Sequence, residues 1–157
     1  MNRFGYLRMK LGKCEDFDDV WSVFQQNKQW FPHVRSSHIK NRLNPDLPSK
    51  GSVIWQDGVV ITYQVYKKKR KISANSDIVL NAGDCVIHQI VARDKGNGSA
   101  FKVMKEFLFS IDKNIYLTVR SDNVVANKFY EKLGMEIVGK THWGKESIPG
   151  VVWRFSE

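Results

Sequence analysis

The segment from Cys85 to Ser99 constrains the fold more than any other part of the sequence. Its first eight residues, CVIHQIVA, are mostly apolar, which is typical of a central strand covered on both faces. The next seven, RDKGNGS, include two glycines, and apolar residues then recur at helical spacing: Phe101, Met104, Leu108 and Ile111, with Phe107 on the flank. A buried strand that runs through a glycine loop into an amphipathic helix predicts a layered, mixed α/β protein.

The loop itself suits an anion. Arg93 to Gly98 spells R-x-x-G-x-G, and glycines let a backbone turn tightly and approach a ligand closely. The helix that follows presents free N–H groups and the positive end of its dipole, while Arg93 and Lys95 add positive charge. These features suit a pyrophosphate, although two glycines in such a place can also do no more than turn the chain. A dinucleotide fingerprint would need glycine at Phe101, and the Gly-Lys-Ser/Thr of a P-loop is absent.

The remaining elements follow from periodicity and turn signals. In the first half we expect a strand at 3–11, a helix starting at the acids 15–19 and ending before Pro32, a helix at 38–43 capped by Ser36-Ser37, and a hairpin of 52–56 and 59–66 around Asp57-Gly58. A polar loop at 73–83 precedes the central strand, and a strand at 115–119, a helix at 123–133 closed by Gly134, and strands at 135–139 and 151–155 end the series. The expected order is β-α-α-β-β-β-α-β-α-β-β.

A second motif lies in the last helix. Asn123 to Met135 reads NVVANKFYEKLGM and resembles the N-x-x-A-x-x-F-Y-x-K-x-G-F signature of the GNAT superfamily of N-acetyltransferases. The resemblance covers residues 84–139 well and the N-terminal third only by element order, and Met135 replaces the usual phenylalanine. It implies a single GNAT-like N-acyltransferase domain over residues 1–157.

The resemblance also implies a reaction. An acetyl or related acyl group would pass directly from coenzyme A to an amine, with the acyl-CoA as co-substrate and no metal. Tyr130 would be the general acid that protonates the departing thiolate. The residues that would contact the coenzyme are Ile90, Val91, Ala92, Arg93, Lys95, Gly96, Asn97, Gly98, Ser99, Asn123 and Asn127.

Helical geometry supports part of this assignment independently. Asn123, Ala126, Asn127 and Tyr130 share one stripe of a helix, and the adjoining apolar stripe, Val125, Phe129 and Leu133, is expected to pack inward. Without the resemblance, the same pattern also fits a packing tyrosine and a plain N-cap.

The general base stays open. His88 is the one residue of the central strand whose ordinary pKa suits the role. It could equally be a hydrogen-bonded core residue, and Asp84, His33 or a chain of waters are alternatives.

A net charge of +9, from 25 Lys and Arg against 16 Asp and Glu, points to polyanionic partners such as coenzyme A or nucleic acid. A basic run follows the predicted hairpin: Lys67, Lys68, Lys69, Arg70 and Lys71. We therefore expect an amine acceptor that is anionic or sits on nucleic acid, although the run could also be a solvated extension. The alternatives are a catalytically inactive module that binds coenzyme A or nucleic acid, and a nucleobase-modifying transferase with a different donor.

Composition excludes several other classes. The chain has two cysteines and no CxxC spacing, which speaks against a disulfide scaffold or a zinc site. It lacks a signal-peptide core and any run of about 20 apolar residues, so we expect a cytoplasmic protein that does not engage a membrane.

Overall fold

The computed structural model describes residues 9–47 and 50–156. Its helices are the 3-10 helix η1 (Cys14–Asp16) and the α-helices α2 (Phe17–Gln26), α3 (Ser36–Leu43), α4 (Ser99–Ser110) and α5 (Val124–Lys132). Its strands are β1 (Ser52–Gln56), β2 (Val59–Val65), β3 (Arg70–Lys71), β4 (Val79–Leu80), β5 (Cys85–Ala92), β6 (Ile115–Arg120), β7 (Glu136–Trp143) and β8 (Ile148–Phe155). None of the helices in these ranges is long and apolar enough to cross a bilayer.

The chain forms two compact units, and strand β5 contributes to both. The first unit takes residues up to Gln64 together with 87–110, and the second takes 65–86 with 111–157. Cys85 and Val86 of β5 therefore belong to the second unit, and the rest of the strand belongs to the first.

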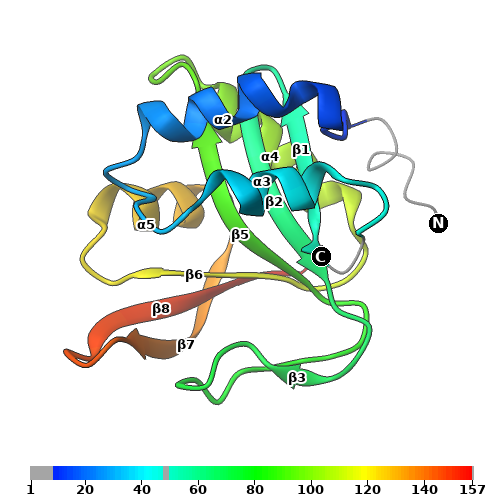
Figure 1. The fold of residues 1–157 in the computed structure, drawn as a ribbon. Coiled ribbons are helices and arrows are strands. Elements are labelled where there is room, and N and C mark those ends of the chain that lie inside the picture. The colour runs from blue at the N-terminus through cyan, green and yellow to red at the C-terminus, as the bar shows by residue number, and fades with distance from the viewer. Residues whose placement is uncertain (1–8, 48–49, 157) are drawn as a thin grey trace. The chain divides into compact units, whose positions relative to one another are not determined.

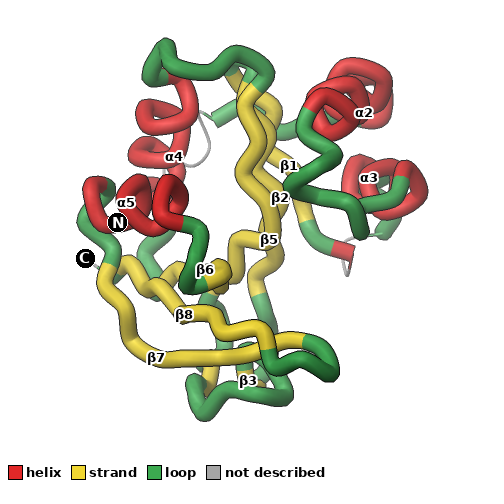
Figure 2. The backbone as a smooth tube through the Cα atoms, turned by 90° about the vertical axis from the view of Figure 1, so that its left-hand side faces the viewer, coloured by secondary structure: helices red, strands yellow, loops and turns green. Residues whose placement is uncertain are grey.

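The first unit is built around the β1–β2 hairpin, in which Ser52 pairs with Tyr63 and Gln56 with Val59. Asp57 and Gly58 both have positive φ, 53° and 76°, which is what a two-residue primed turn requires, so the predicted hairpin is confirmed. Helices α2 and α3 cover one face of these strands and α4 covers the other (Figures 1 and 2).

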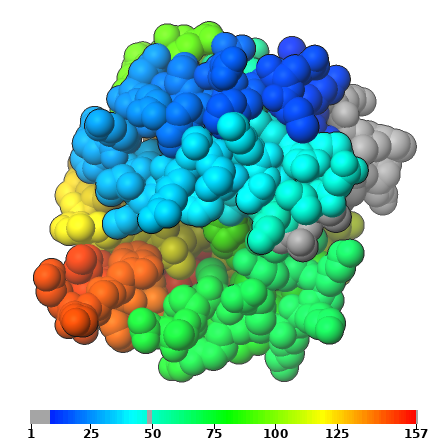
Figure 3. Space-filling model, in the orientation of Figure 1, coloured from blue at the N-terminus to red at the C-terminus, as the bar shows by residue number. Residues whose placement is uncertain are grey.

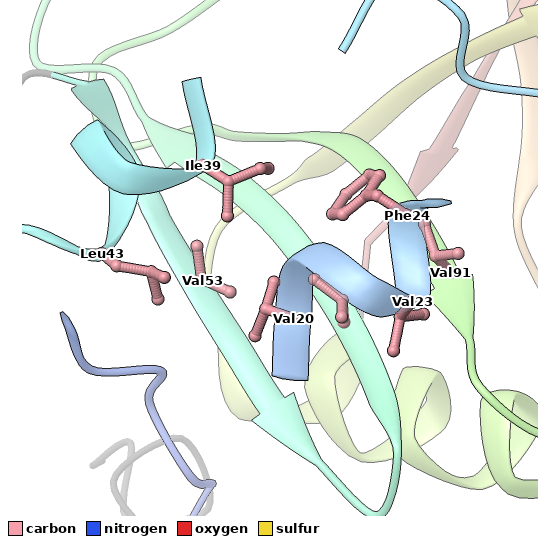
Figure 4. Packing of buried hydrophobic residues seen from close by; sticks show 8 residues of the cluster. Val20, Val23, Phe24, Ile39, Leu43, Val53 and Val91 are labelled. Carbon is pink, nitrogen blue, oxygen red and sulfur yellow. The ribbon is translucent and has the colours of Figure 1, made fainter. Parts of the chain in front are cut away.

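Apolar side chains fill both sides of that sheet. Val20 and Phe24 of α2 meet Ile39 and Leu43 of α3 over Val53, Val60 and Val91 (Figure 4). On the α4 side, the Phe107 ring is fully buried edge-on against Tyr63, with centroids 4.9 Å apart. Phe107 is thus a central residue of the helix and not a flanking one as predicted.

Two predictions for the N-terminal half need correction. Most of the strand expected at 3–11 lies outside the described residues; within them, Leu11 forms only an isolated bridge to Ile54. Helix α3 already includes both serines, and its N-cap is Arg35, whose backbone N–H donates to His38 Nδ1 at 3.4 Å.

In the second unit, β8 lies between β6 and β7 and pairs antiparallel with both, while Cys85 and Val86 pair parallel with the start of β6. Helix α5 covers one face of these strands, and the segment with β3 and β4 lies on the other (Figure 2). That segment replaces the expected polar loop, and Leu80, Val86, Tyr116 and Val152 form the core beneath it. Strands β7 and β8 also run several residues beyond their predicted ends.

Candidate active site

Strand β5 is buried at its start and more exposed to solvent in its middle. Cys85, Val86 and Ile87 are buried, whereas His88 is exposed and Ile90 is half-buried. The interpretation of His88 as a core residue is therefore wrong. An exposed imidazole leaves a role in proton transfer available to it.

The Cys85 thiol is buried, and burial together with the neighbouring Asp84 carboxylate raises its pKa. Asp84 is itself buried, and its carboxylate accepts the backbone N–H of Asn81 at 2.7 Å, closing the turn before β5. His33 is exposed in the first unit.

The loop after β5 is exposed from Arg93 to Gly98 and has an open backbone. Gly96 and Gly98 have φ of 78° and 79°, and a Cβ added to either would meet no atom within 4 Å. Positive φ is the reason for glycine here, because L side chains adopt it at a cost. The two glycines leave an uncovered stretch of main chain at the N-terminus of the 12-residue helix α4.

Hydrogen bonds fix both ends of this loop. The Arg93 N–H donates to Gly58 O at 2.8 Å, and the Ser99 N–H donates to Asn97 Oδ1 at 3.0 Å. Within the described residues, the backbone N–H groups of 95–98 have no hydrogen-bond acceptor, so they can donate to a ligand. Arg93 Nε lies 3.4 Å from the Asp94 carboxylate, which offsets part of the positive charge expected there.

Helix α5 begins and ends as predicted. Asn123 is its N-cap, with Oδ1 accepting the Ala126 N–H at 3.1 Å, and Gly134 follows its end with φ of 91°. The prediction that the apolar stripe of this helix packs inward is only partly correct, because Leu133 is buried but Val125 is 81% exposed.

The Asn127 amide joins three parts of the second unit. Its Nδ2 donates to Asn123 O at 2.8 Å and to Arg120 O at 3.1 Å, and its Oδ1 accepts from Trp153 Nε1 at 2.8 Å. This group therefore links the end of β6, the start of α5 and strand β8. The sequence reading missed Trp153, because nothing local marks a partner 26 residues away.

Tyr130 lies one helical turn after Asn127 on the same stripe. Its ring centroid is 5.6 Å from that of Phe129 and 6.1 Å from that of Trp153. Burial raises the pKa of Tyr130 to about 12, so the phenol keeps its proton at neutral pH. A protonated phenol in an aromatic setting can serve as a proton donor.

The predicted residues thus fall into two groups, each coherent in its own unit. His88 and the residues from Ile90 to Ser99 form a continuous strand and loop in the first unit. Asn123, Asn127 and Tyr130 form one stripe of α5 in the second.

No protein-family model matches the sequence, and no curated protein matches it. Solved structures do match the fold. A GNAT-family acetyltransferase from Streptococcus agalactiae superposes with a TM-score of 0.71 at 13% identity, over 96% of this chain and 95% of that one. Another from Bacillus cereus gives 0.64 at 13% identity, over 96% of each chain.

Arabidopsis thaliana NAA60, solved in complex with acetyl-CoA, superposes with a TM-score of 0.65 at 14% identity, over 95% of this chain and 98% of that one. The match extends over nearly the whole length of each of these enzymes. This chain therefore has the fold of the GNAT acetyltransferases, as its two motifs predicted.

Proposed function

We propose that the chain is an acyl-CoA-dependent N-acyltransferase that moves an acetyl or related acyl group to an amine. The observation that carries the proposal is the uncovered main chain between Arg93 and Ser99. Its free N–H groups and the N-terminus of α4 suit the diphosphate of coenzyme A, because oriented amides and the helix dipole both favour negative charge.

The residues present fit this ligand in chemistry. Arg93, Lys95 and the loop amides would hold the diphosphate, and the backbone from Ile90 to Ala92 would bind the amide groups of the pantetheine arm. Asn123 and Asn127 are the polar groups of α5 that belong to the proposed site. The internal hydrogen bonds of Asn127 favour an orienting role for its side chain.

Acyl-CoA supplies an activated thioester. The chain must remove one proton from the attacking amine and donate one proton to the departing sulfur. An alkyl amine with a pKa near 10.4 is mostly protonated at pH 7, which opposes attack by roughly 4–5 kcal/mol. We propose that His88 or a chain of waters removes that proton. Tyr130, still protonated at this pH, would donate its proton to the departing sulfur.

The acceptor is proposed to be anionic or part of a nucleic acid. The net charge of +9 supports this, since a basic surface attracts anions and repels small cations such as polyamines.

A matched pair of glycine variants tests the loop. Gly98→Ala places a methyl group at φ 79° beside the open amides, and Gly144→Ala places one at φ 71° in the β7–β8 turn, with no atom within 4 Å of either. Both should lower the unfolding free energy by about 1 kcal/mol through backbone strain. Only Gly98→Ala should lose stabilisation by acetyl-CoA, which for the wild type at 100 times its Kd is about 2.7 kcal/mol.

Release of free thiol in the presence of an amine library then separates enzyme from binding module. Stabilisation without thiol release on any amine would favour an inactive module. Equal stabilisation of the two glycine variants by acetyl-CoA, or no stabilisation of the wild type, would contradict the proposed binding of the diphosphate to the loop from Arg93 to Ser99.

A further inference from the structure

Residues 66–84, which contain β3 and β4, form a segment that we call the ribbon. It carries five consecutive exposed cations: Lys67, Lys68, Lys69, Arg70 and Lys71. In the described part of the chain, no carboxylate lies within 4.0 Å of any of them. The ribbon contains two acids. Asp84 is buried in its turn, and Asp77 is exposed but forms no ion pair with the run. The positive charge of the run is therefore not neutralised locally.

The ribbon is fastened to the second unit. Ile72, Ile78 and Leu80 belong to the apolar core that also includes Tyr116 and Val152. The Ser73 and Thr141 hydroxyls are 3.0 Å apart, and Asn75 Nδ2 donates to His142 O at 3.1 Å. A charged segment held in this way loses little conformational freedom on binding, which favours affinity.

Arg70 is also oriented. Its guanidinium carbon lies 4.6 Å from the centroid of the Tyr66 ring, a cation–π arrangement. The guanidinium is thus supported on one side by an aromatic ring, and a planar guanidinium binds phosphate through two hydrogen bonds.

A cavity of about 450 Å³ adjoins the basic run, between residues 75–78 of the ribbon and residues 138–142 of β7. In Figure 3 the green ribbon lies beside the orange segment that contains β7. Lys71 Nζ donates to Ala74 O at 3.4 Å, and Ala74 directly precedes Asn75 of the lining. Lys140 and His142 add basic groups to its lining, and Asp77 is the one carboxylate there.

We propose that the ribbon and β7 form a nucleic-acid-binding surface, in which the basic run contacts backbone phosphates and the cavity receives part of a nucleotide. Lys and Arg side chains supply many of the contacts that proteins make with backbone phosphates. The cavity is open to solvent, and its amide and hydroxyl groups suit a sugar or base. An anionic membrane surface is the competing partner for a basic run, and the vesicle measurement below distinguishes it from nucleic acid. None of the residues of this surface belongs to the proposed coenzyme site.

The test measures binding of fluorescein-labelled 20-nucleotide RNA, single-stranded DNA and duplex DNA of mixed sequence by anisotropy, from 50 to 200 mM salt. Affinity should fall with salt at a log–log slope of about −2 to −4, as expected for three to five neutralised phosphates. The combined variant Lys67→Ala, Lys68→Ala and Lys69→Ala should weaken binding at least about tenfold and reduce the slope by about 2.

The control removes the same three charges elsewhere. Lys28→Ala, Lys50→Ala and Lys105→Ala are exposed positions in the first unit, and either triple variant lowers the net charge from +9 to +6. The control should lose less than about threefold in affinity, since only the local cluster contacts phosphate. Lys140→Ala alone should reduce the slope by about 1.

Three results would overturn the proposal: salt-insensitive or absent binding, equal losses in the two triple variants, or tighter binding to poly-glutamate or anionic vesicles than to any nucleic acid. Acetyl-CoA stabilisation, measured on the same variants, should not change. A failed binding test would therefore remove nucleic acid as the acceptor but leave acyl transfer from acetyl-CoA standing. Failure of the acetyl-CoA test would leave this surface standing.

Discussion

The Asn127–Trp153 hydrogen bond offers a quantitative test of how the second unit holds α5. Trp153 is 4% exposed, so Asn127→Ala leaves a buried indole N–H without its acceptor and the backbone carbonyls of Arg120, Ser121 and Asn123 without a side-chain donor. A buried unsatisfied donor costs about 1–3 kcal/mol, and each lost hydrogen bond about 0.5–1.5 kcal/mol. We expect the unfolding free energy to fall by about 2–4 kcal/mol.

A double-mutant cycle with Trp153→Phe isolates the bond itself. Phenylalanine removes the indole N–H, so the second mutation should cost less once the first is present. Urea unfolding of the wild type, both single variants and the double variant should give a coupling of about 1–2 kcal/mol. Asn127→Asp is a useful companion, because it keeps an acceptor for Trp153 but turns a carboxylate oxygen towards the carbonyls of Arg120 and Asn123.

A coupling below about 0.5 kcal/mol, the usual limit for independent sites, would contradict an energetic contribution of the Asn127–Trp153 hydrogen bond. So would an Asn127→Ala variant that is as stable as the wild type. Either result would mean that α5 is held by its apolar contacts alone.

Three further predictions concern stability and reactivity. Gly139→Ala should destabilise by about 1–3 kcal/mol in urea, because its Cβ would lie 2.6 Å from Ile78 Cγ1; an unchanged midpoint would show that Ile78 moves aside freely. In the folded protein at pH 8, a disulfide reagent should modify exposed Cys14 quickly and buried Cys85, whose pKa is raised, only on unfolding; two equally fast thiols would contradict this. Because the pKa of Tyr130 is about 12 when folded and near 10 when unfolded, the phenol contributes stability that is complete below pH 10 and lost as pH rises towards 12, so the wild type should lose up to about 2 kcal/mol more than Tyr130→Phe over that interval.

The sequence predicted best those elements that carry local signals. Strand β5, the loop with Gly96 and Gly98, and helix α4 were placed almost to the residue, since an apolar strand, glycines and a helical period mark their boundaries. Helix α5 has an N-cap and a terminal glycine, and it was placed equally well.

The elements that the sequence missed depend on contacts between distant residues. The ribbon is ordered by packing against β7, where the missing side chain of Gly139 leaves room for Ile78. No local sequence pattern predicts this contact. Lys140, Thr141 and His142 lie beyond the strand predicted at 135–139, yet they continue β7 because β8 pairs with them. Val125 faces outward although its spacing suggested burial, since α5 contacts the sheet through the adjoining stripe, where Asn127 and Tyr130 meet Trp153.

The division of the chain into two interleaved units has a consequence for the order in which it folds during synthesis. Every residue of the first unit lies at or before Ser110, whereas the second needs β8, which pairs with both of its neighbours, up to Phe155. Domains tend to fold as their residues emerge from the ribosome. The first unit would then fold first. The ribbon lies in the sequence between the two segments of the first unit, so it is already synthesised at that point. Its apolar residues stay uncovered until β7 and β8 emerge.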